Sequence, residues 1–160
     1  MKLTTKFPLL GLLAATVGAT LAMSTGVATA SSVTSIQSVL VATLPSSAPF
    51  VLNANGTYTA YGPNGSRVDT GRVTAQGVLP AQPPRATQIE TFRTYTSSDQ
   101  LSSLQLHCSE ISRPGAPAGT VTGRCAVLKA AGVYAGLSGS GPATGATTIP
   151  PPTLSDTISF

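Results

Sequence analysis

Acidic side chains that could act as a general acid or base are few in this sequence. Glu90, Asp99 and Glu110 lie close together near the middle of the chain. A carboxyl group exchanges protons near neutral pH when burial in an apolar cavity raises its pKa. Glu90 is the leading candidate for a catalytic group of this kind, and the sequence leaves open which of the three is buried.

The only histidine, His107, restricts the other kinds of chemistry. A single histidine cannot build a multi-histidine metal site, so no metal is expected. His107 precedes Cys108, and successive side chains of a strand point to opposite faces. A solvated or hydrogen-bonded strand histidine is therefore favoured over a general base.

Three arginines, Arg67, Arg93 and Arg124, lie in segments with strand-like patterns. The simplest interpretation is that they are surface charges. The alternative is that one of them enters a lumen and holds an anionic ligand. Arg93 and Tyr95, which share a strand face, are the candidate ligand-binding residues.

The two cysteines predict a local register. If Cys108 lies opposite Cys125 in an antiparallel hairpin, Leu106 lies opposite Val127 and Glu110 opposite Gly123. Leu104, Leu106 and Cys108 then share one face with Val121, Cys125 and Val127. In an exported protein this pair is expected to form a disulfide, which closes a loop of about 16 residues and contributes about 3 kcal/mol by chain entropy.

A glycine-rich stretch near the end of the chain, Gly139 to Gly145, has the spacing G-x-G-x-x-x-G. A dinucleotide-binding loop needs a strand before it, a helix after it and an acidic residue on the next strand. Pro142 and the Pro-rich segment at 149–152 leave no room for that unit, so no cofactor is expected. The longer stretch from Gly132 to Gly145 is predicted to form a strand-loop-strand element, with glycines supplying unusual φ angles and close strand contacts.

The first 30 residues have the features of a signal peptide. Lys2 and Lys6 precede a mostly small or apolar segment, and Ala28-Thr29-Ala30 has the form that signal peptidase cleaves. Cleavage near Ala30 predicts a secreted or periplasmic protein. The remaining chain, 31–160, contains seven of the nine basic residues and all five acidic ones, a net charge of +2. This charge is too small and too scattered for a nucleic-acid surface, and no later stretch reaches the about 20 apolar residues of a membrane span.

Alternating strand patterns separated by turn residues predict one all-β domain over 31–160. Strands are expected within 49–78, with turns at Asn55-Gly56 and at Gly62 to Gly65 and a bulge at Gly71. Further strands are expected at Thr87–Thr96, Leu101–Ile111 and Thr120–Leu128, with a Pro-rich loop at 146–153. An antiparallel eight-stranded barrel is the expected fold, and a β-sandwich is the alternative.

Both predicted turns in the first part of the domain contain an N-glycosylation sequon. Asn55 and Asn64 are each followed by glycine and then by a hydroxyl residue. Turn geometry explains each Asn-Gly pair, and modification would also require a host with the machinery. The sequence leaves glycosylation open.

Four segments of the chain together resemble secreted bacterial proteins of the allene oxide cyclase-like and dirigent-like β-barrel group. They are "NGTYTAYG", "DTGRVTAQG", "IETFRTYTSSDQLSSLQLHC" and "GTVTGRCAVLKAAGVYAGLSGSGPATG". The last segment resembles the family pattern Gly-x-Tyr/Phe-x-Gly-x-x-Gly-x-Gly, which is matched here by Gly132, Tyr134, Gly136, Gly139 and Gly141. The resemblance implies an eight-stranded antiparallel barrel whose lumen is a ligand or reaction cavity, and a homo-oligomer, since plant members are often trimers. The Pro-rich segment at 149–152 puts the last strand, around Leu154 to Phe160, in doubt as the strand that closes the barrel.

Two functions of different class follow. The first is a non-catalytic exported barrel that binds a small apolar ligand or a surface partner. The second is an isomerase or cyclase that uses a lumen carboxylate, with Glu90 as the candidate. The first is favoured because histidine and clustered acids are scarce.

Overall fold

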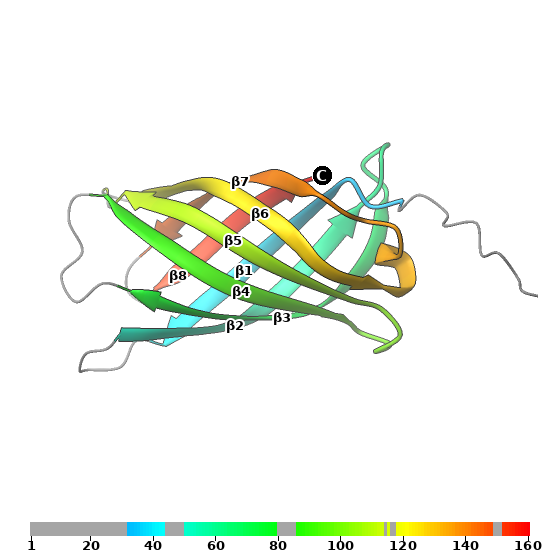
Figure 1. Cartoon of the computed structure of the whole chain (residues 1–160), viewed down its shortest axis with the longest axis horizontal. Helices are drawn as coiled ribbons and strands as arrows, with labels where there is room; N and C mark the ends of the chain where they lie inside the picture. The colour runs from blue at the N-terminus through cyan, green and yellow to red at the C-terminus, as the bar shows by residue number, and fades with distance from the viewer. Residues whose placement is uncertain (1–31, 44–49, 80–85, 114, 116–117, 149–151) are drawn as a thin grey trace, which may run out of the picture.

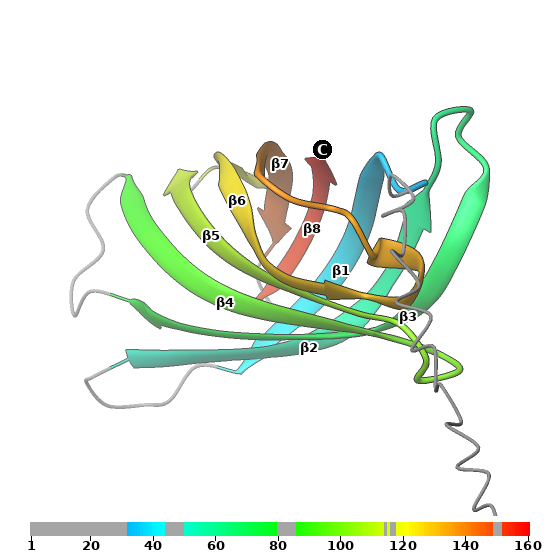
Figure 2. The same ribbon diagram turned by 45° about the vertical axis from the view of Figure 1, so that its right-hand side comes forward.

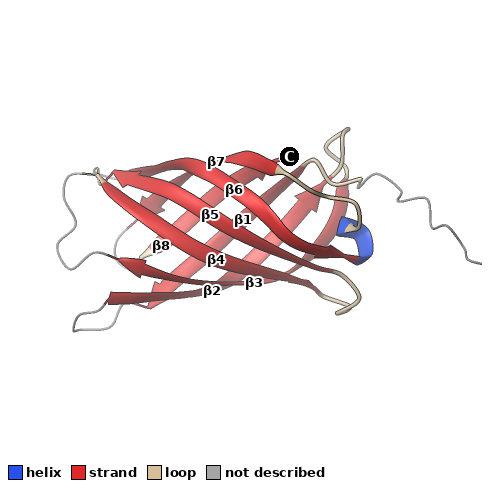
Figure 3. Cartoon of the chain, in the orientation of Figure 1, coloured by secondary structure: helices blue, strands red, loops and turns tan. Residues whose placement is uncertain are grey.

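The computed structural model describes residues 32–43, 50–79, 86–113, 115, 118–148 and 152–160. The described residues form eight antiparallel strands that close into one barrel, with a single short 3-10 helix (Figures 1 and 3). This confirms the barrel and excludes the sandwich. The elements, in chain order, are β1 (Ser35–Thr43), β2 (Phe50–Tyr61), β3 (Arg67–Leu79), β4 (Thr87–Ser97), β5 (Ser103–Arg113), β6 (Gly119–Ala131), η1 (Gly132–Tyr134), β7 (Ser140–Thr148) and β8 (Thr153–Ser159).

Each strand pairs with the next one along the chain, and β1 pairs with β8 to close the barrel (Figure 2). The doubt about the last strand is therefore removed, because β8 pairs with β1 from Thr153 to Ser159. The β1 strand was not among the predicted segments. Its inward side chains alternate with valines that face outward and stay exposed, Val39 and Val41, so the sequence lacks the usual apolar-polar alternation.

The turn predicted at Asn55-Gly56 is wrong, because both residues lie in the middle of β2. Gly56 lies opposite Leu40 of β1, and a Cβ atom built on it would lie 1.8 Å from the carbonyl oxygen of Val39. Glycine is needed here for close strand contact rather than for a hairpin turn. The turn at Gly62 to Gly65 is confirmed, with Gly65 at a φ of 70°.

The bulge expected at Gly71 is absent. Gly71 is paired regularly, whereas the register of β2 against β3 shifts between Ala60 and Tyr61. The two sequon asparagines consequently differ in setting. Asn55 is exposed in the middle of a strand, and Asn64 is exposed in the β2–β3 turn.

The register predicted from the cysteines is confirmed in β5 and β6. Cys108 pairs with Cys125, Leu106 with Val127 and Glu110 with Gly123. The disulfide is present and fully buried inside the barrel. In β4, whose faces the sequence left open, Thr91, Arg93 and Tyr95 point inward while Gln88, Glu90 and Phe92 point outward.

The stretch from Gly132 to Gly145 connects β6 through η1 to β7 and forms the first part of that strand, as predicted. Gly132, Gly136 and Gly139 have φ angles of 66°, 87° and 84°, a region that favours glycine. Tyr134 is buried and Leu137 packs against the core. The following strand, β7, runs through Thr148, so the connection predicted at 146–153 is shorter than expected.

Tyrosines fill the barrel near η1, the end at the right of Figure 1. The ring of Tyr58 packs edge to face against Tyr95, at 5.2 Å between centroids. The hydroxyls of Tyr58 and Tyr134 lie 2.8 and 2.7 Å from Oδ2 of Asp69, and burial and this neighbouring carboxylate raise the pKa of both tyrosines. This end is therefore packed, and free space lies towards the other end.

Candidate functional site

A cavity of about 390 Å³ occupies the end of the barrel where β1, β3, β5 and β7 terminate, at the left of Figure 1. A row of small side chains on adjacent strands makes the space, because Ala42 lies opposite Ala54 and Ala54 opposite Ala75. Leucine, isoleucine, valine and threonine side chains form most of the remaining wall. Ligand cavities typically measure about 300–1,000 Å³ and combine apolar walls with a few polar groups.

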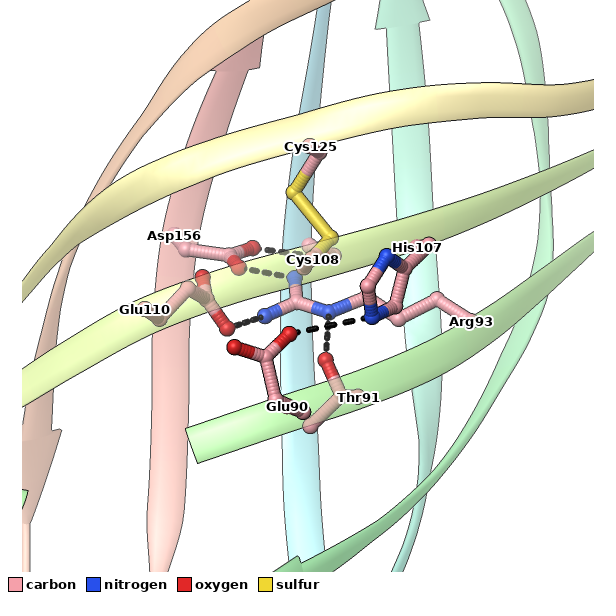
Figure 4. Close-up of a disulfide and its surroundings, with 9 residues drawn as sticks. Glu90, Thr91, Arg93, His107, Cys108, Glu110, Cys125 and Asp156 are labelled. Carbon is pink, nitrogen blue, oxygen red and sulfur yellow. Dashed lines mark hydrogen bonds and ion pairs between the residues drawn. A yellow bond between two sulfur atoms is a disulfide. The ribbon is translucent and has the colours of Figure 1, made fainter. Parts of the chain in front are cut away.

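The polar groups of the cavity belong to a buried ionic cluster, which we define as Arg93, Glu110 and Asp156. Arg93 and Glu110 line the cavity, and Asp156 lies behind them on β8. The guanidinium Nη2 lies 2.5 Å from Oε2 of Glu110, and Nη1 contacts Oδ2 of Asp156. The Nε of Arg93 donates to Thr91 at 3.3 Å, and Ser38 donates to the other oxygen of Asp156. Figure 4 shows both carboxylates at the tip of the Arg93 side chain, each joined to the guanidinium by a dashed line.

Side-chain alternation places Glu110 in the lumen. It lies two residues after Cys108 on β5 and therefore on the same face as the disulfide. Each cluster carboxylate pairs with a glycine, Glu110 with Gly123 and Asp156 with Gly145. A Cβ on Gly123 would lie 2.8 Å from Cγ of Glu110, so glycine leaves room for the inward carboxylate.

Burial determines the electrostatics of the cluster. It raises the pKa of Glu110 above the ordinary glutamate value, although the charge of Arg93 acts in the opposite direction. Burial also opposes the charge of Arg93, but Tyr95, Asp156 and Glu110 together raise its pKa. Arg93 therefore stays positive, and burial favours the neutral form of Glu110.

Glu90 does not lie in the lumen. Its side chain is 43% exposed on the outer face of the sheet, where Nε2 of His107 lies 3.0 Å from its Oε2. Hydrogen bonds from Ser109 and Gln88, at 2.6 and 2.9 Å, lower its pKa. We call Glu90, His107, Ser109 and Gln88 the outer polar cluster. The hypothesis that Glu90 is a lumen acid is therefore wrong, because alternation along β4 directs it away from the cavity.

His107 faces away from the disulfide, as the sequence predicted. Its ring stacks on Phe92 at 4.8 Å between centroids. Asp99 is exposed in the β4–β5 turn, where the hydroxyl of Ser97 and the backbone N–H of Leu101 hydrogen-bond to it and lower its pKa. None of these groups borders the cavity.

The other candidate residues from the sequence, three arginines and one tyrosine, divide into exposed and buried residues. Arg67 and Arg124 are exposed, and Arg124 donates to Ser140 on the neighbouring strand at 3.0 Å. Arg93 and Tyr95 are both buried in the lumen, but only Arg93 lines the cavity. Two carboxylates already neutralise Arg93, which argues against its holding an anionic ligand. Glu110 was a candidate acid in the sequence but was not predicted to lie in the lumen, although its position two residues after Cys108 indicated this.

The described residues include neither a metal-binding cluster nor a membrane-spanning helix. No group of three or more His, Cys, Asp or Glu side chains is placed to hold a metal ion in that part of the chain. None of its helices has the length and apolarity needed to cross a membrane. The predicted signal peptide, 1–30, lies outside the described residues.

Comparison of the chain with protein-family models, with curated proteins and with solved structures found no match. The resemblance to the allene oxide cyclase-like and dirigent-like barrels therefore stays a prediction from sequence. The cavity and its ionic cluster carry the functional argument.

Proposed function

We propose that this chain is an exported barrel that binds a small apolar ligand in its lumen without converting it. The observation that carries the proposal is the cavity of about 390 Å³, which the alanine row on β1, β2 and β3 keeps open. Packed protein interiors contain few voids larger than a water molecule. A wall of alanines where larger side chains would fill the space therefore favours a cavity with an occupant.

Export is supported by two independent features. The predicted signal peptide ends near Ala30, and the Cys108–Cys125 disulfide is typical of proteins that fold in an oxidising compartment. The resemblance to secreted bacterial barrels is consistent with both. It also implies a homo-oligomer, which remains part of the proposal.

The experiment compares lumen and surface variants of one strand. N-phenyl-1-naphthylamine, a neutral probe that fluoresces in apolar surroundings, is titrated against the purified chain. Ala75 lines the cavity, and Thr74 next to it points outward. We expect Ala75→Leu to weaken probe binding at least about tenfold, a loss of about 1.4 kcal/mol, and Thr74→Leu to leave it unchanged. Equal binding by both variants, or no binding by the unaltered chain, would overturn the proposal.

A second candidate function, an isomerase or cyclase, is favoured by one specific observation. Glu110 is a buried carboxyl with a raised pKa at the cavity wall, the property expected of a lumen acid. The compound that co-purifies with the chain, extracted and identified by mass spectrometry, separates the two functions. A single compound recovered unchanged after incubation with fresh protein supports binding. A mixture that the chain interconverts, and Glu110→Gln does not, supports catalysis.

A further inference from the structure

The buried ionic cluster is unbalanced in charge. One guanidinium, that of Arg93, faces two carboxylates, those of Glu110 and Asp156. Each nitrogen of the guanidinium already contacts a partner, since Nε reaches Thr91. The cluster therefore carries one excess negative charge when both acids are ionised and none when Glu110 is protonated. In neither state does it present a net positive charge to the cavity.

The two carboxylates differ in how their oxygens are used. Both oxygens of Asp156 have a donor, Ser38 on one and Arg93 on the other. Glu110 uses Oε2 for Arg93, but its Oε1 is buried and has no hydrogen-bond partner among the described residues. Figure 4 shows one oxygen of Glu110 turned to Arg93 and the other turned away from it. A buried acceptor without a donor is destabilising and rare in folded proteins.

Among the described residues, no group is placed to supply that donor. Gly123, opposite on β6, has no side chain to offer. The charged neighbours of Glu110 in the lumen are Arg93 on β4, which donates to the other oxygen of Glu110, and Asp156 on β8, which accepts hydrogen bonds from Ser38 and Arg93. Glu110 lines the cavity although Oε1 itself is covered, so a donor in the cavity reaches Oε1 when the carboxyl group turns towards the cavity.

We propose that the lumen ligand carries a hydrogen-bond donor without negative charge, a hydroxyl or a protonated amine, which donates to Oε1 of Glu110. This inference rests on the proposed lumen binding and names the chemical class of the ligand. The apolar body lies against the alanine row, and the polar group reaches the ionic cluster. Carboxylate ligands are disfavoured, because their charge would meet the carboxylate of Glu110 or a guanidinium that is already paired.

The experiment uses four probes with the same ten-carbon chain. Decanol, decylamine, decanoate and decane compete with N-phenyl-1-naphthylamine for the full chain at neutral pH, each below the concentration at which it forms micelles. We expect decanol and decylamine to displace the dye at concentrations about tenfold or more below those needed for decanoate and decane, as a hydrogen bond to a charged acceptor predicts.

Substitution of Glu110 by glutamine replaces one hydrogen-bond acceptor of the carboxylate with a donor. The amide of Glu110→Gln keeps an oxygen for Arg93 and turns an N–H₂ donor towards the cavity in place of the acceptor. Decylamine should then bind about tenfold more weakly and decanoate more tightly, while decane is unaffected. Glu90→Gln, on the outer face of the neighbouring strand, is the matched control and should leave the order of the four probes unchanged.

The outcomes separate the ligand class from lumen binding itself. If the dye does not bind, or if no ten-carbon probe displaces it, lumen binding is overturned. If all four probes compete equally, or decanoate competes best, lumen binding stands and the donor assignment is overturned. Equal affinity for decane and decanol would show that water, rather than ligand, satisfies Oε1. Should Glu110→Gln fail to fold, the order of the four probes on the unaltered chain still decides the question.

Discussion

The two faces of the β4–β5 hairpin carry similar residues in opposite environments. On the inner face, Glu110 is buried and binds Arg93 at 2.5 Å. On the outer face, Glu90 is 43% exposed and contacts His107 at 3.0 Å. Burial raises the pKa of the inner glutamate, whereas hydrogen bonds from Ser109 and Gln88 lower that of the outer one.

The comparison shows that position relative to the sheet, rather than residue type, decides what a charged group can do. Outer charges keep their hydration and interact weakly. Inner charges have lost their hydration, so the stability of the folded state depends on the groups that pair with them. The same desolvation makes Glu110 able to exchange a proton or accept a hydrogen bond from a ligand. Three predictions test this contrast, beginning with the largest effect.

Removing the inner cation should be severely destabilising. Arg93→Met fills a similar volume but leaves Glu110 and Asp156 buried without a counter-charge. We expect the free energy of unfolding, measured by urea titration near pH 7, to fall by about 3–5 kcal/mol. Lowering the pH should restore part of the loss, because protonation removes the unpaired charges.

Arg72, an exposed arginine on the adjacent strand β3, provides the matched control. Arg72→Met removes the same charge and should change the free energy of unfolding by about 0.5 kcal/mol or less. Similar losses for the two variants would contradict the contrast between the faces. So would an Arg93→Met variant as stable as the unaltered chain.

Much of the fold could be predicted from local sequence patterns. The cysteine pair defined the β5–β6 register, and the Gly62 to Gly65 turn was correct. The wrong predictions concern sequence motifs that are compatible with two different structures. Asn55-Gly56 is typical of a tight turn, but glycine is also required where two strands cross closely, and only the paired strand reveals which applies.

The site was harder to predict because it depends on closure of the barrel. Cys108 indicated the inner face of β5, and this face includes Glu110 two residues later. On β4 both faces carry large side chains, so the sequence did not exclude an inward Glu90. Asp156 lies 63 residues from Arg93, and only the pairing of β8 with β1 brings the two together.

The pH dependence of stability should have opposite signs for the two glutamates. The pKa of Glu110 is raised in the folded state, so its contribution is fully present below the ordinary value of 4.5 and is lost as the pH rises through the folded pKa. The non-titrating variant Glu110→Gln should therefore gain stability relative to the unaltered chain as the pH rises. The gain should be about 1.4 kcal/mol for each unit by which the pKa is raised.

Glu90→Gln is the comparison in the same urea experiment. The lowered pKa of Glu90 contributes stability above pH 4.5 that is lost as the pH falls through its folded pKa, so this variant should gain only in acid. The groups that act on Glu110 are Arg93 and Asp156 in the lumen and Glu90 across the sheet. If both variants gave the same sign between pH 4 and 8, the assignment of inner and outer environments would be wrong.

The smallest effect belongs to the outer polar cluster. A double-mutant cycle with Glu90→Gln and His107→Gln measures the coupling of that pair, whose side chains are 43% and 39% exposed. We expect a coupling energy of about 0.5 kcal/mol or less at pH 6, falling further in high salt, because exposed ion pairs are screened. A coupling above about 1.5 kcal/mol would mean that the outer face is desolvated in solution, for instance against a second copy of the chain. The two glutamates would then lie in similar environments, and the contrast between them would be wrong.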